Sequence, residues 1–292
     1  MLVVGCGDVG LRAARLLAPR LRLLALTSSP ARVAELRGHG IVPLRGDLDQ
    51  PATLRRLAGL ATRVLHLAPP PAEGAAADAG RDPRTRALLQ ALRLRGRPSA
   101  LVYGSTSGVY GDCAGARVAE TRPLAPRTPR AQRRVDAERL VRFFGRQAGV
   151  RTHLLRIPGI YAADREGGTP RTRLLKGTPV LEAADDVYTN HIQADDLARA
   201  CVAALWRGRP QRACNVNDDT ELRMGDYFDL AADLYGLPRP PRLPRGTAAG
   251  ELPLVLLSFM SESRRLDNTR LKRELRLALR YPTVASGLRA AG

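Results

Sequence analysis

The sequence predicts an α/β protein of the Rossmann type, in which a doubly wound parallel sheet is followed by a smaller C-terminal region. Two observations support this prediction. Short apolar segments alternate with segments of helical periodicity from residue 1 to about residue 157, an order typical of parallel strands joined by right-handed crossovers. A glycine-rich turn, Gly5 to Gly10, stands between the first apolar segment and the first helical one.

The elements of the first half follow from hydrophobic period and from turn residues. We expect strands at 2–4, 21–27, 41–44, 64–67, 99–103 and 151–156. We expect helices at 11–17, from 30 to about 38, and at 51–57, 83–94 and 128–147. The stretch from Pro69 to Gly80 is rich in proline, alanine and glycine, which predicts a loop of the kind that often borders sites.

The glycine-rich turn has the spacing G-x-G-x-x-G directly after a strand and directly before a helix, the context in which this motif binds a dinucleotide. The first glycine permits the tight turn, the second lets the backbone approach a pyrophosphate, and the third allows close helix–strand packing. Free N–H groups at the helix N-terminus favour phosphates. The alternative is a glycine-rich turn without a ligand. The residues expected to contact a dinucleotide here are Gly5, Gly7, Asp8, Val9 and Gly10.

The second strand should end on the residue that contacts the adenosine ribose, about 20 residues after the glycine loop. That position is Thr27, followed by Ser28, with Arg32 one helical turn further on. An NAD-preferring site usually has Asp or Glu at this point. Hydroxyls and a guanidinium suit a 2′-phosphate better, so the sequence favours NADP, with NAD as the other option. The alternative for Arg32 is an ordinary solvated helix residue.

The second half of the chain is less regular. Strand-like segments occur at 187–192 and 213–216, helices are expected at 194–206, 225–235 and 269–277, and 237–244 is a proline-rich connector. We therefore expect a dinucleotide-binding core over residues 1–157 and a mainly substrate-binding region over 158–292. From that region, 187–216 is expected to return to the core sheet.

The formal net charge of +19 comes almost entirely from arginine, because Lys176 and Lys272 are the only lysines. The arginines are scattered and form neither a basic tail nor a stripe interleaved with aromatic residues. This distribution indicates a compositional bias and argues against a nucleic-acid partner, although a basic surface attracts acidic molecules in general.

The spacing of the cysteines and the lengths of the apolar stretches indicate in which cellular compartment the protein lies. Four widely spaced cysteines with no C-x-x-C pair indicate reduced thiols in a cytosol, and suggest neither disulfides nor a metal site. No apolar stretch has the length of a membrane span, and no leader pattern opens the sequence. We expect a cytoplasmic protein without membrane contact, either a monomer or a homodimer.

Further segments share the pattern of one superfamily. Residues 105–111 read Ser-Thr-Ser-Gly-Val-Tyr-Gly, similar to its S-T-x-x-V-Y-G signature. Residues 155–161 resemble its L-R-x-x-x-x-Y segment, 191–198 its H-V-x-D-D-L-A element, and 268–275 its C-terminal helix. With the glycine loop, these motifs resemble the extended short-chain dehydrogenase/reductases, in the NAD-dependent epimerase/dehydratase group, over nearly the whole chain.

The resemblance implies further cofactor contacts. Asp47 and Leu48 would contact the adenine, and the loop after the fourth strand would pass the cofactor. The segment after residue 156 would place its backbone beside the nicotinamide. The residues implied in these two segments are Leu67, Ala68, Pro69, Pro158 and Ile160.

The resemblance also implies an active site, and here the sequence departs from the family. Thr106 would bond the reacting oxygen of the substrate. A Tyr-x-x-x-Lys pair on the next long helix supplies acid/base catalysis, which is usually worth roughly 10²–10⁴ in rate. The spacing to Glu138 puts Arg130 at the tyrosine position and Arg134 at the lysine position. Both members of the pair are replaced.

The two arginines keep some of the chemistry. Arg134 can still donate hydrogen bonds to a ribose. Arg130 cannot give up a proton near neutral pH, because its pKa is above about 12, but it could stabilise an oxyanion or clamp a carboxylate or phosphate. Tyr110 and Tyr161 are the nearest phenols that could substitute, with packing as their alternative role. His191 before two aspartates is interpreted as a packed histidine next to an N-capping Asp, rather than as an acid/base pair.

Three functions remain open from the sequence. The first is an NADP(H)-binding reductase, dehydratase or epimerase with an altered site, which acts on a small substrate, and on an anionic one if the arginines face the pocket. The second is a non-catalytic dinucleotide-binding sensor or scaffold. The third is a nucleic-acid-binding protein on the same fold. Whether the chain is an enzyme is uncertain at this stage, because the usual acid/base pair is missing.

Overall fold

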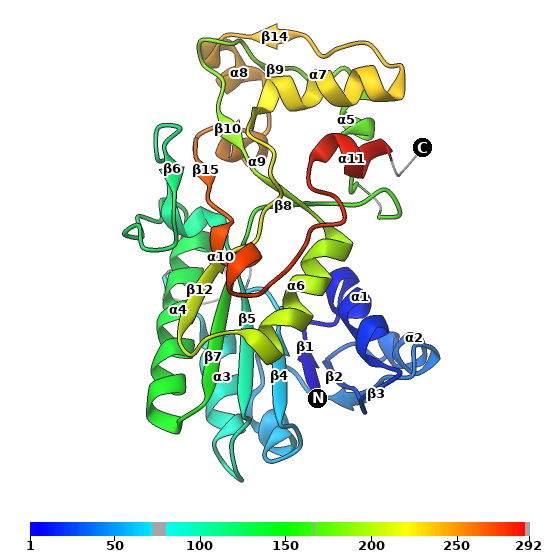
Figure 1. The fold of residues 1–292 in the computed structure, drawn as a ribbon, viewed down its shortest axis with the longest axis vertical. Helices are drawn as coiled ribbons and strands as arrows, with labels where there is room; N and C mark the ends of the chain where they lie inside the picture. The colour runs from blue at the N-terminus through cyan, green and yellow to red at the C-terminus, as the bar shows by residue number, and fades with distance from the viewer. Residues whose placement is uncertain (72–79, 166, 290–292) are drawn as a thin grey trace.

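The computed structural model describes residues 1–71, 80–165 and 167–289. Residues 72–79, the middle of the loop expected between Pro69 and Gly80, lie outside the described residues. The predicted Rossmann-type fold is confirmed: seven parallel strands form one sheet in the order β12-β7-β5-β4-β1-β2-β3 (Figure 1). The order reverses at β1, so chain segments on both sides of β1 meet at the carboxyl-terminal edge of the sheet.

The strands of the central sheet and the helices that cover it lie close to their expected positions. The strands of the sheet are β1 (Leu2–Val4), β2 (Leu24–Thr27), β3 (Val42–Arg45), β4 (Arg63–His66), β5 (Ala100–Thr106), β7 (Arg151–Ile157) and β12 (Arg212–Asn215). The helices are α1 (Asp8–Leu17), α2 (Arg32–Gly38), α3 (Pro83–Leu92), α4 (Pro129–Ala148) and α6 (Ala194–Arg207). The helix expected at 51–57 is a 3₁₀ helix, η1 (Pro51–Leu57).

Two apolar cores cover the two faces of the sheet. Successive strand residues point to opposite faces, so Val3 packs with α1 and α6, whereas Leu2 and Val4 pack with α3 and α4. Figure 1 shows α1 and α6 side by side in front of the sheet, and contacts between these two helices are extensive. Burial of both faces explains why the central strands β1 and β2 are almost uninterrupted apolar runs.

Local signals fix where α4 begins and ends. The Oγ1 atom of Thr128 accepts a hydrogen bond from the N–H of Ala131 (3.2 Å), and Pro129 occupies the first turn, where its missing N–H costs nothing. Gly149 ends the helix in the left-handed region at φ 61°. These caps set the register that places Arg130 and Arg134 at the helix start.

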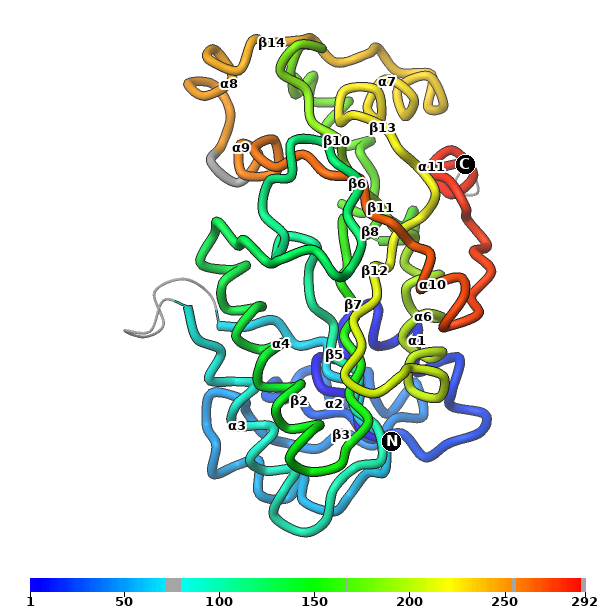
Figure 2. Tube along the Cα trace, turned by 60° about the vertical axis from the view of Figure 1, so that its left-hand side comes forward, coloured from blue at the N-terminus to red at the C-terminus, as the bar shows by residue number. Residues whose placement is uncertain are grey.

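A second lobe stands above the carboxyl-terminal edge of the sheet (Figures 1 and 2). Its core packs around α7 (Met224–Tyr235) and includes Tyr227 and Phe228. Its remaining elements are β8 (Gly159–Tyr161), α5 (Arg171–Leu175), β9 (Val180–Leu181), β10 (Tyr188–Thr189), β11 (His191–Gln193), β13 (Leu222–Arg223), β14 (Arg242–Leu243), α8 (Arg245–Glu251), α9 (Leu254–Phe259) and α11 (Val284–Arg289).

The segment 187–216 is split between the two parts. Its β12 joins the central sheet beside β7, and α6 packs on α1. Its other two strands do not join that sheet, because β10 pairs with β13 and β11 pairs with β8. The division of the chain at residue 157 remains a prediction.

Four short elements connect the lobe to the core, and two sequence predictions in this region are wrong. These elements are η2 (Ser107–Tyr110), the strand pair β6 (Arg117–Val118) with β15 (Arg265–Leu266), and α10 (Thr269–Arg273). The helix expected at 269–277 ends early, and Arg276 takes a φ of 51° outside the helical region. The cap of α6 is Gln193 rather than an aspartate, because its Oε1 accepts from the N–H groups of Asp195 and Asp196.

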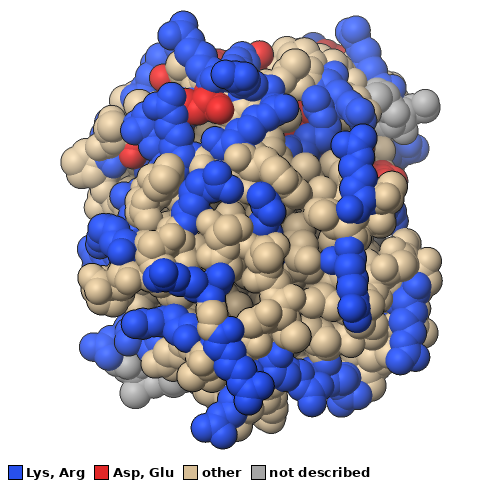
Figure 3. Space-filling view, turned by 60° about the horizontal axis from the view of Figure 1, so that its bottom comes forward, with Lys and Arg blue, Asp and Glu red and all other residues tan. Residues whose placement is uncertain are grey.

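Basic side chains outnumber acidic ones on the face at the amino-terminal ends of the strands. Figure 3 shows many Lys and Arg side chains and few Asp and Glu side chains on this face, among uncharged residues. Four connections at this end, 18–23, 93–99, 146–150 and 207–211, together hold eight arginines and no Asp or Glu. Within the described residues, no helix combines the length and the apolar character that a bilayer crossing requires.

Candidate functional site

The glycine loop lies between β1 and α1, and each of its glycines meets a different environment. Gly5 has a φ of 84°, and a Cβ there would lie 2.2 Å from the backbone N of Ala68. A Cβ on Gly10 would lie 3.0 Å from the carbonyl oxygen of Gly5. In contrast, a Cβ on Gly7 would meet no atom within 4 Å. Gly5 and Gly10 are therefore required by packing, whereas Gly7 leaves backbone open toward the space beside the helix start.

A cavity of about 400 Å³ opens in front of this loop. Its walls come from the loop and from the ends of β2, β3 and β4, segments that the crossover order brings to one sheet edge. Ten of the sequence-predicted cofactor residues line it: Gly5, Gly7, Thr27, Ser28, Arg32, Asp47, Leu48, Leu67, Ala68 and Pro69. Cys6 also lines the cavity, and burial raises the pKa of its thiol to about 11, so it is neutral near pH 7.

Arg32 lies at the point where the second strand turns into α2. Its Nη2 donates to the carbonyl oxygen of Cys6 (2.6 Å), and its Nε pairs with Glu35 (2.8 Å). Thr27 organises the turn, because its Oγ1 accepts from the N–H of Ser29 (3.2 Å). The exposed Ser28 stands between them. A guanidinium and a hydroxyl are thus held at the cavity wall next to the glycine loop.

The opposite rim includes an ion pair that the sequence patterns did not predict. Arg84 on α3 forms a two-point contact with Asp49, at 2.7 and 2.5 Å, and also donates to the carbonyl oxygen of Pro69 (3.3 Å). The hydrogen bonds from Arg84 lower the pKa of Asp49. Nothing in the local pattern linked two residues 35 positions apart, so only the fold could bring them together.

The other predicted loop residues, Asp8, Val9 and Gly10, do not line this cavity. Asp8 is instead bonded to Arg12, Oδ1 to Nε at 2.9 Å. Arg12, 8% exposed, also reaches Asp195 on α6 and Asp164 in the second lobe, each at 2.6 Å. This arginine ties the helix after the glycine loop to the second lobe. The i,i+4 spacing of Asp8 and Arg12 was a readable signal for part of that cluster.

Thr106 lies at the carboxyl end of β5, next to the first turn of α4, which holds Arg130. Thr106 is half-buried, and its Oγ1 accepts from the N–H of Gly108 (3.3 Å). A Cβ on Gly108 would lie 3.7 Å from that Oγ1 and 3.8 Å from the Cβ of Ala131, so the first turn of α4 packs next to Thr106. Arg130 is exposed at the same turn. Desolvation by the surrounding protein, followed by repulsion from Arg134, lowers the pKa of Arg130 below its ordinary value.

Arg134 is 7% exposed and lies one turn further along α4. Its Nη1 donates to the carbonyl oxygen of Gly104 (2.7 Å) and to the hydroxyl of Tyr103 (3.0 Å). Across the described residues, neither Arg130 nor Arg134 has a carboxylate at ion-pair distance. Among the residues that the structure describes, the start of α4 therefore presents two guanidinium groups without an ion-pair partner.

The two phenols considered as substitute proton donors are held in buried bonds. Tyr110 is 1% exposed; its hydroxyl donates to Asn215 (2.7 Å) and accepts from Arg156 (2.9 Å). Burial raises its pKa to about 12. Tyr161 is 3% exposed, burial raises its pKa, and its hydroxyl donates to the carbonyl of Thr283 (3.4 Å). Neither hydroxyl is free to meet a substrate in this conformation, so we do not retain Tyr110 as a catalytic residue.

The remaining predicted residues follow β7. Pro158 and Ile160 are both half-buried, and Ile160 packs against the core beneath α1 and α6. Neither lines the cavity at the glycine loop. His191 is a packed residue: it is 8% exposed and its ring stacks on Tyr227 at 4.1 Å. Burial lowers the pKa of His191 to about 4.

The fold and this cavity define a Rossmann-type protein with the geometry of a dinucleotide site. Residues 1–217 match the NAD dependent epimerase/dehydratase family. The match covers most of the chain, and the chain belongs to this family.

Individual relatives agree with that assignment. The GDP-6-deoxy-D-mannose reductase of Pseudomonas aeruginosa is 30% identical over 217 residues, which are 66% of this chain and 70% of that protein. A solved structure of a functionally unknown conserved protein from Silicibacter pomeroyi is 32% identical with a TM-score of 0.83, over 99% of this chain and 96% of that chain. The UDP-glucose 4-epimerase of Thermotoga maritima, solved with UDP-glucose, shares the fold at 19% identity and a TM-score of 0.78, over 99% and 96% of the two chains.

Proposed function

We propose that the chain is an NADP(H)-dependent reductase, dehydratase or epimerase that acts on a small phosphorylated substrate of the sugar-nucleotide class. The observation that carries this proposal is that Arg130 and Arg134, at the start of the helix that packs next to Thr106, have no ion-pair partner among the described residues. Two such cations near a candidate reacting group favour an anionic substrate. The relatives named for GDP-6-deoxy-D-mannose and for UDP-glucose act on or hold compounds that carry phosphates.

The residues at the glycine loop fit a dinucleotide. The open space over Gly7 leaves room for a pyrophosphate close to the backbone, and the start of α1 supplies N–H groups. Thr27, Ser28 and Arg32 lie where a 2′-phosphate would be bound, and the second strand ends without an acidic residue there. These features favour NADP over NAD. When bound, the cofactor would give or take the hydride.

The roles of the chain's own residues follow from their chemistry. Thr106 can donate a hydrogen bond to the reacting oxygen of the substrate. Arg130 stabilises negative charge on that oxygen, because a guanidinium stays protonated near pH 7 even when its pKa is lowered. Arg134 commits Nη1 to Gly104 and Tyr103, which holds its guanidinium plane in place and leaves Nη2 for the cofactor ribose. The proton of the reaction then comes from water rather than from a phenol.

Steady-state kinetics test the catalytic proposal. The full chain is assayed with NADPH and with NADP against carbonyls, alcohols and sugar nucleotides, together with Arg130→Gln and Arg134→Gln. We expect turnover of a phosphorylated substrate, which Arg130→Gln lowers by roughly 100-fold in kcat, a loss typical of one removed oxyanion contact. The matched control is Arg37→Gln, an exposed arginine on α2.

Three results would count against the proposal. Tight dinucleotide binding without turnover of any substrate would favour the sensor or scaffold. Unchanged kinetics in Arg130→Gln would remove that residue from the site. A preference for uncharged substrates would contradict the proposal that Arg130 and Arg134 attract an anionic substrate.

The cofactor preference has its own test, Arg32→Ala. Loss of a charge-assisted contact costs about 1.5–3 kcal/mol, or roughly 10- to 150-fold in affinity. We expect NADPH affinity to fall by that factor, measured by fluorescence titration. Removal of the bond from Arg32 to Cys6 affects both cofactors alike, so the ratio of NADPH to NADH affinity isolates the 2′-phosphate. An unchanged ratio would show that Arg32 does not contact that phosphate.

A further inference from the structure

A second cavity, of about 500 Å³, lies at the β12 edge of the sheet. It is bounded by α4, by β12, by α10 and by the loop after β6, and it shares no lining residue with the cavity at the glycine loop. Six arginines line it: Arg122, Arg139, Arg142, Arg156, Arg212 and Arg270. The carboxylates in its wall are Glu120 and Glu138.

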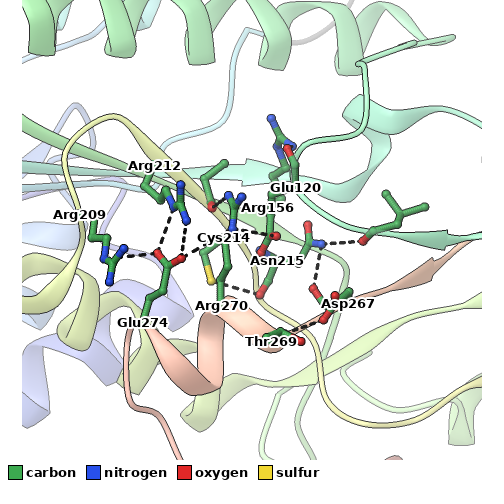
Figure 4. Close-up of polar contacts among 12 residues, drawn as sticks. Glu120, Arg156, Arg209, Arg212, Cys214, Asn215, Asp267, Thr269, Arg270 and Glu274 are labelled. Atoms are coloured by element: carbon green, nitrogen blue, oxygen red, sulfur yellow. Dashed lines mark hydrogen bonds and ion pairs between the residues drawn. The ribbon is translucent and has the colours of Figure 1, made fainter.

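Three of these arginines are neutralised by buried or half-buried acids. Arg156 pairs with Glu138 at 2.8 Å, and both side chains are only 2% exposed. Arg270 pairs with Glu120 (3.3 Å). Figure 4 shows Glu274 on α10's C-terminal side, in contact with Arg212 and Arg209 at the same time. The carboxylates of Glu120, Glu138 and Glu274 are therefore already held in ion pairs.

The other three arginines, Arg122, Arg139 and Arg142, have no carboxylate at ion-pair distance in the part of the chain that the structure describes. Arg122 and Arg139 are exposed at the rim. Arg142 is half-buried, and its Nε is shielded from solvent without a hydrogen-bond partner. A buried donor left unpaired costs about 1–3 kcal/mol, so such a group usually marks a missing partner.

The surroundings of Arg142 point to an anion as that partner. Desolvation lowers the pKa of its guanidinium; Glu138 opposes this effect, and repulsion from Arg156, Arg146 and Arg270 adds to it. An anion in the cavity would offset this repulsion, accept from Nε and reach the two rim arginines. Phosphate matches the fork of donors on a guanidinium, and it carries enough charge for several of them.

We propose that this cavity is a second anion site, separate from the dinucleotide site, which binds a small phosphorylated ligand through Arg142 with Arg122 and Arg139. The volume exceeds what a single phosphate fills, so the ligand carries an organic group or a second phosphate. The proposal does not depend on the assigned reaction, because its three arginines are neither the residues assigned to that reaction nor residues that line the cavity at the glycine loop.

Calorimetric titration of the full chain with inorganic pyrophosphate tests the proposal, at about 150 mM NaCl so that bare charge attraction is screened. Arg142→Gln is compared with Arg146→Gln, an exposed arginine one turn further along the same helix that does not line the cavity. We expect one pyrophosphate per chain, an affinity at least 10-fold lower in Arg142→Gln, and a change of less than 2-fold in Arg146→Gln. Circular dichroism checks the fold; if Arg142→Gln does not fold, the exposed pair Arg122→Gln/Arg139→Gln replaces it with the same expectation.

Two more titrations locate the bound pyrophosphate and separate phosphate recognition from charge alone. Pyrophosphate could also enter the dinucleotide cavity at the backbone of Gly7, so Gly7→Ala is titrated as well and should bind unchanged. Citrate, an anion of similar charge without phosphorus, should bind at least 10-fold more weakly. The proposal is overturned by absence of binding, by equal losses in Arg142→Gln and Arg146→Gln, by loss of binding in Gly7→Ala, or by equal affinity for citrate. Tighter binding of inorganic phosphate than of pyrophosphate would contradict the inference that the ligand is larger than a single phosphate.

Discussion

The side chains at positions 130 and 134 change what the start of α4 can do. A phenol and an amine would exchange a proton, whereas two guanidinium groups hold charge and donate hydrogen bonds. The sequence was enough to predict both replacements, because the spacing to Glu138 fixes the register. It was not enough to predict that Nη1 of Arg134 is committed to Gly104 and Tyr103, since that depends on side-chain direction across two elements.

Asp218 shows a residue-scale effect that no sequence motif signalled. It is 1% exposed, and its Oδ1 accepts from the N–H of Thr220 (3.0 Å), while Oδ2 has no partner. Desolvation by burial raises its pKa to about 7, and the nearby Asp219 and Asp196 add to the shift.

The raised pKa of Asp218 predicts that the free energy of unfolding depends on pH. Between about pH 4, near the unfolded value, and pH 7 the folded state binds more protons than the unfolded state, so stability falls as pH rises through that window. Asp218→Asn keeps the acceptor for Thr220 and removes the charge. We expect the variant to be about 2–4 kcal/mol more stable than the wild type at pH 8 and nearly equal at pH 4, by urea unfolding. A stability difference that stays constant with pH would refute the assigned titration.

At the scale of elements, α4 connects the candidate site to the sheet. Glu138 accepts from Arg156 on β7 and from Ser105 on β5 (2.7 Å), so one carboxylate joins a helix and two strands. The bounds of α4 were predictable from Thr128, Pro129 and the glycine at 149. The ion pair was not, because its members belong to different elements and no local period links them.

The buried pair of Glu138 and Arg156 predicts that a single replacement destabilises the protein more than replacement of both residues. Removal of one partner leaves a buried charge and costs about 3–5 kcal/mol, whereas two apolar replacements of similar volume are often nearly neutral. We expect Glu138→Leu to lower the free energy of unfolding by that amount, and Glu138→Leu/Arg156→Met to lower it by less than the single change. Urea unfolding of Glu138→Leu, Arg156→Met and the double variant measures this. A double variant that costs as much as the sum of the singles would show that the two charges are independent.

At the scale of the whole molecule, arginine occurs both at the candidate sites and at the end of the sheet opposite the dinucleotide cavity. The sites described lie at the carboxyl-terminal edge and at the β12 edge of the sheet, whereas the connections at the opposite end carry arginine without acids (Figure 3). The parallel sheet of the core was predictable, because apolar segments alternate with segments of helical period and the glycine-rich turn joins the first strand to the first helix. The second lobe was not, because most of its strands are only two or three residues long and pair outside the central sheet.

The central claim is that the backbone at Gly7 receives the phosphates of a nicotinamide dinucleotide, and Gly7→Ala tests it most directly. Gly7 has a φ of −82°, which alanine adopts readily, and its Cβ would meet nothing within 4 Å. The variant should therefore fold with a Tm within about 2 °C of the wild type, since changes away from packed sites are usually within about 0.5 kcal/mol. Gly5→Ala is the contrasting variant, because its Cβ would overlap Ala68 and destabilise the fold.

Fluorescence titration of wild type and Gly7→Ala with NADPH and NADH gives the decisive comparison. The account predicts that the wild type binds NADPH and that Gly7→Ala, equally folded, binds both dinucleotides at least 10-fold more weakly. Equal affinity in the two proteins, or a wild type that binds neither dinucleotide, would contradict it.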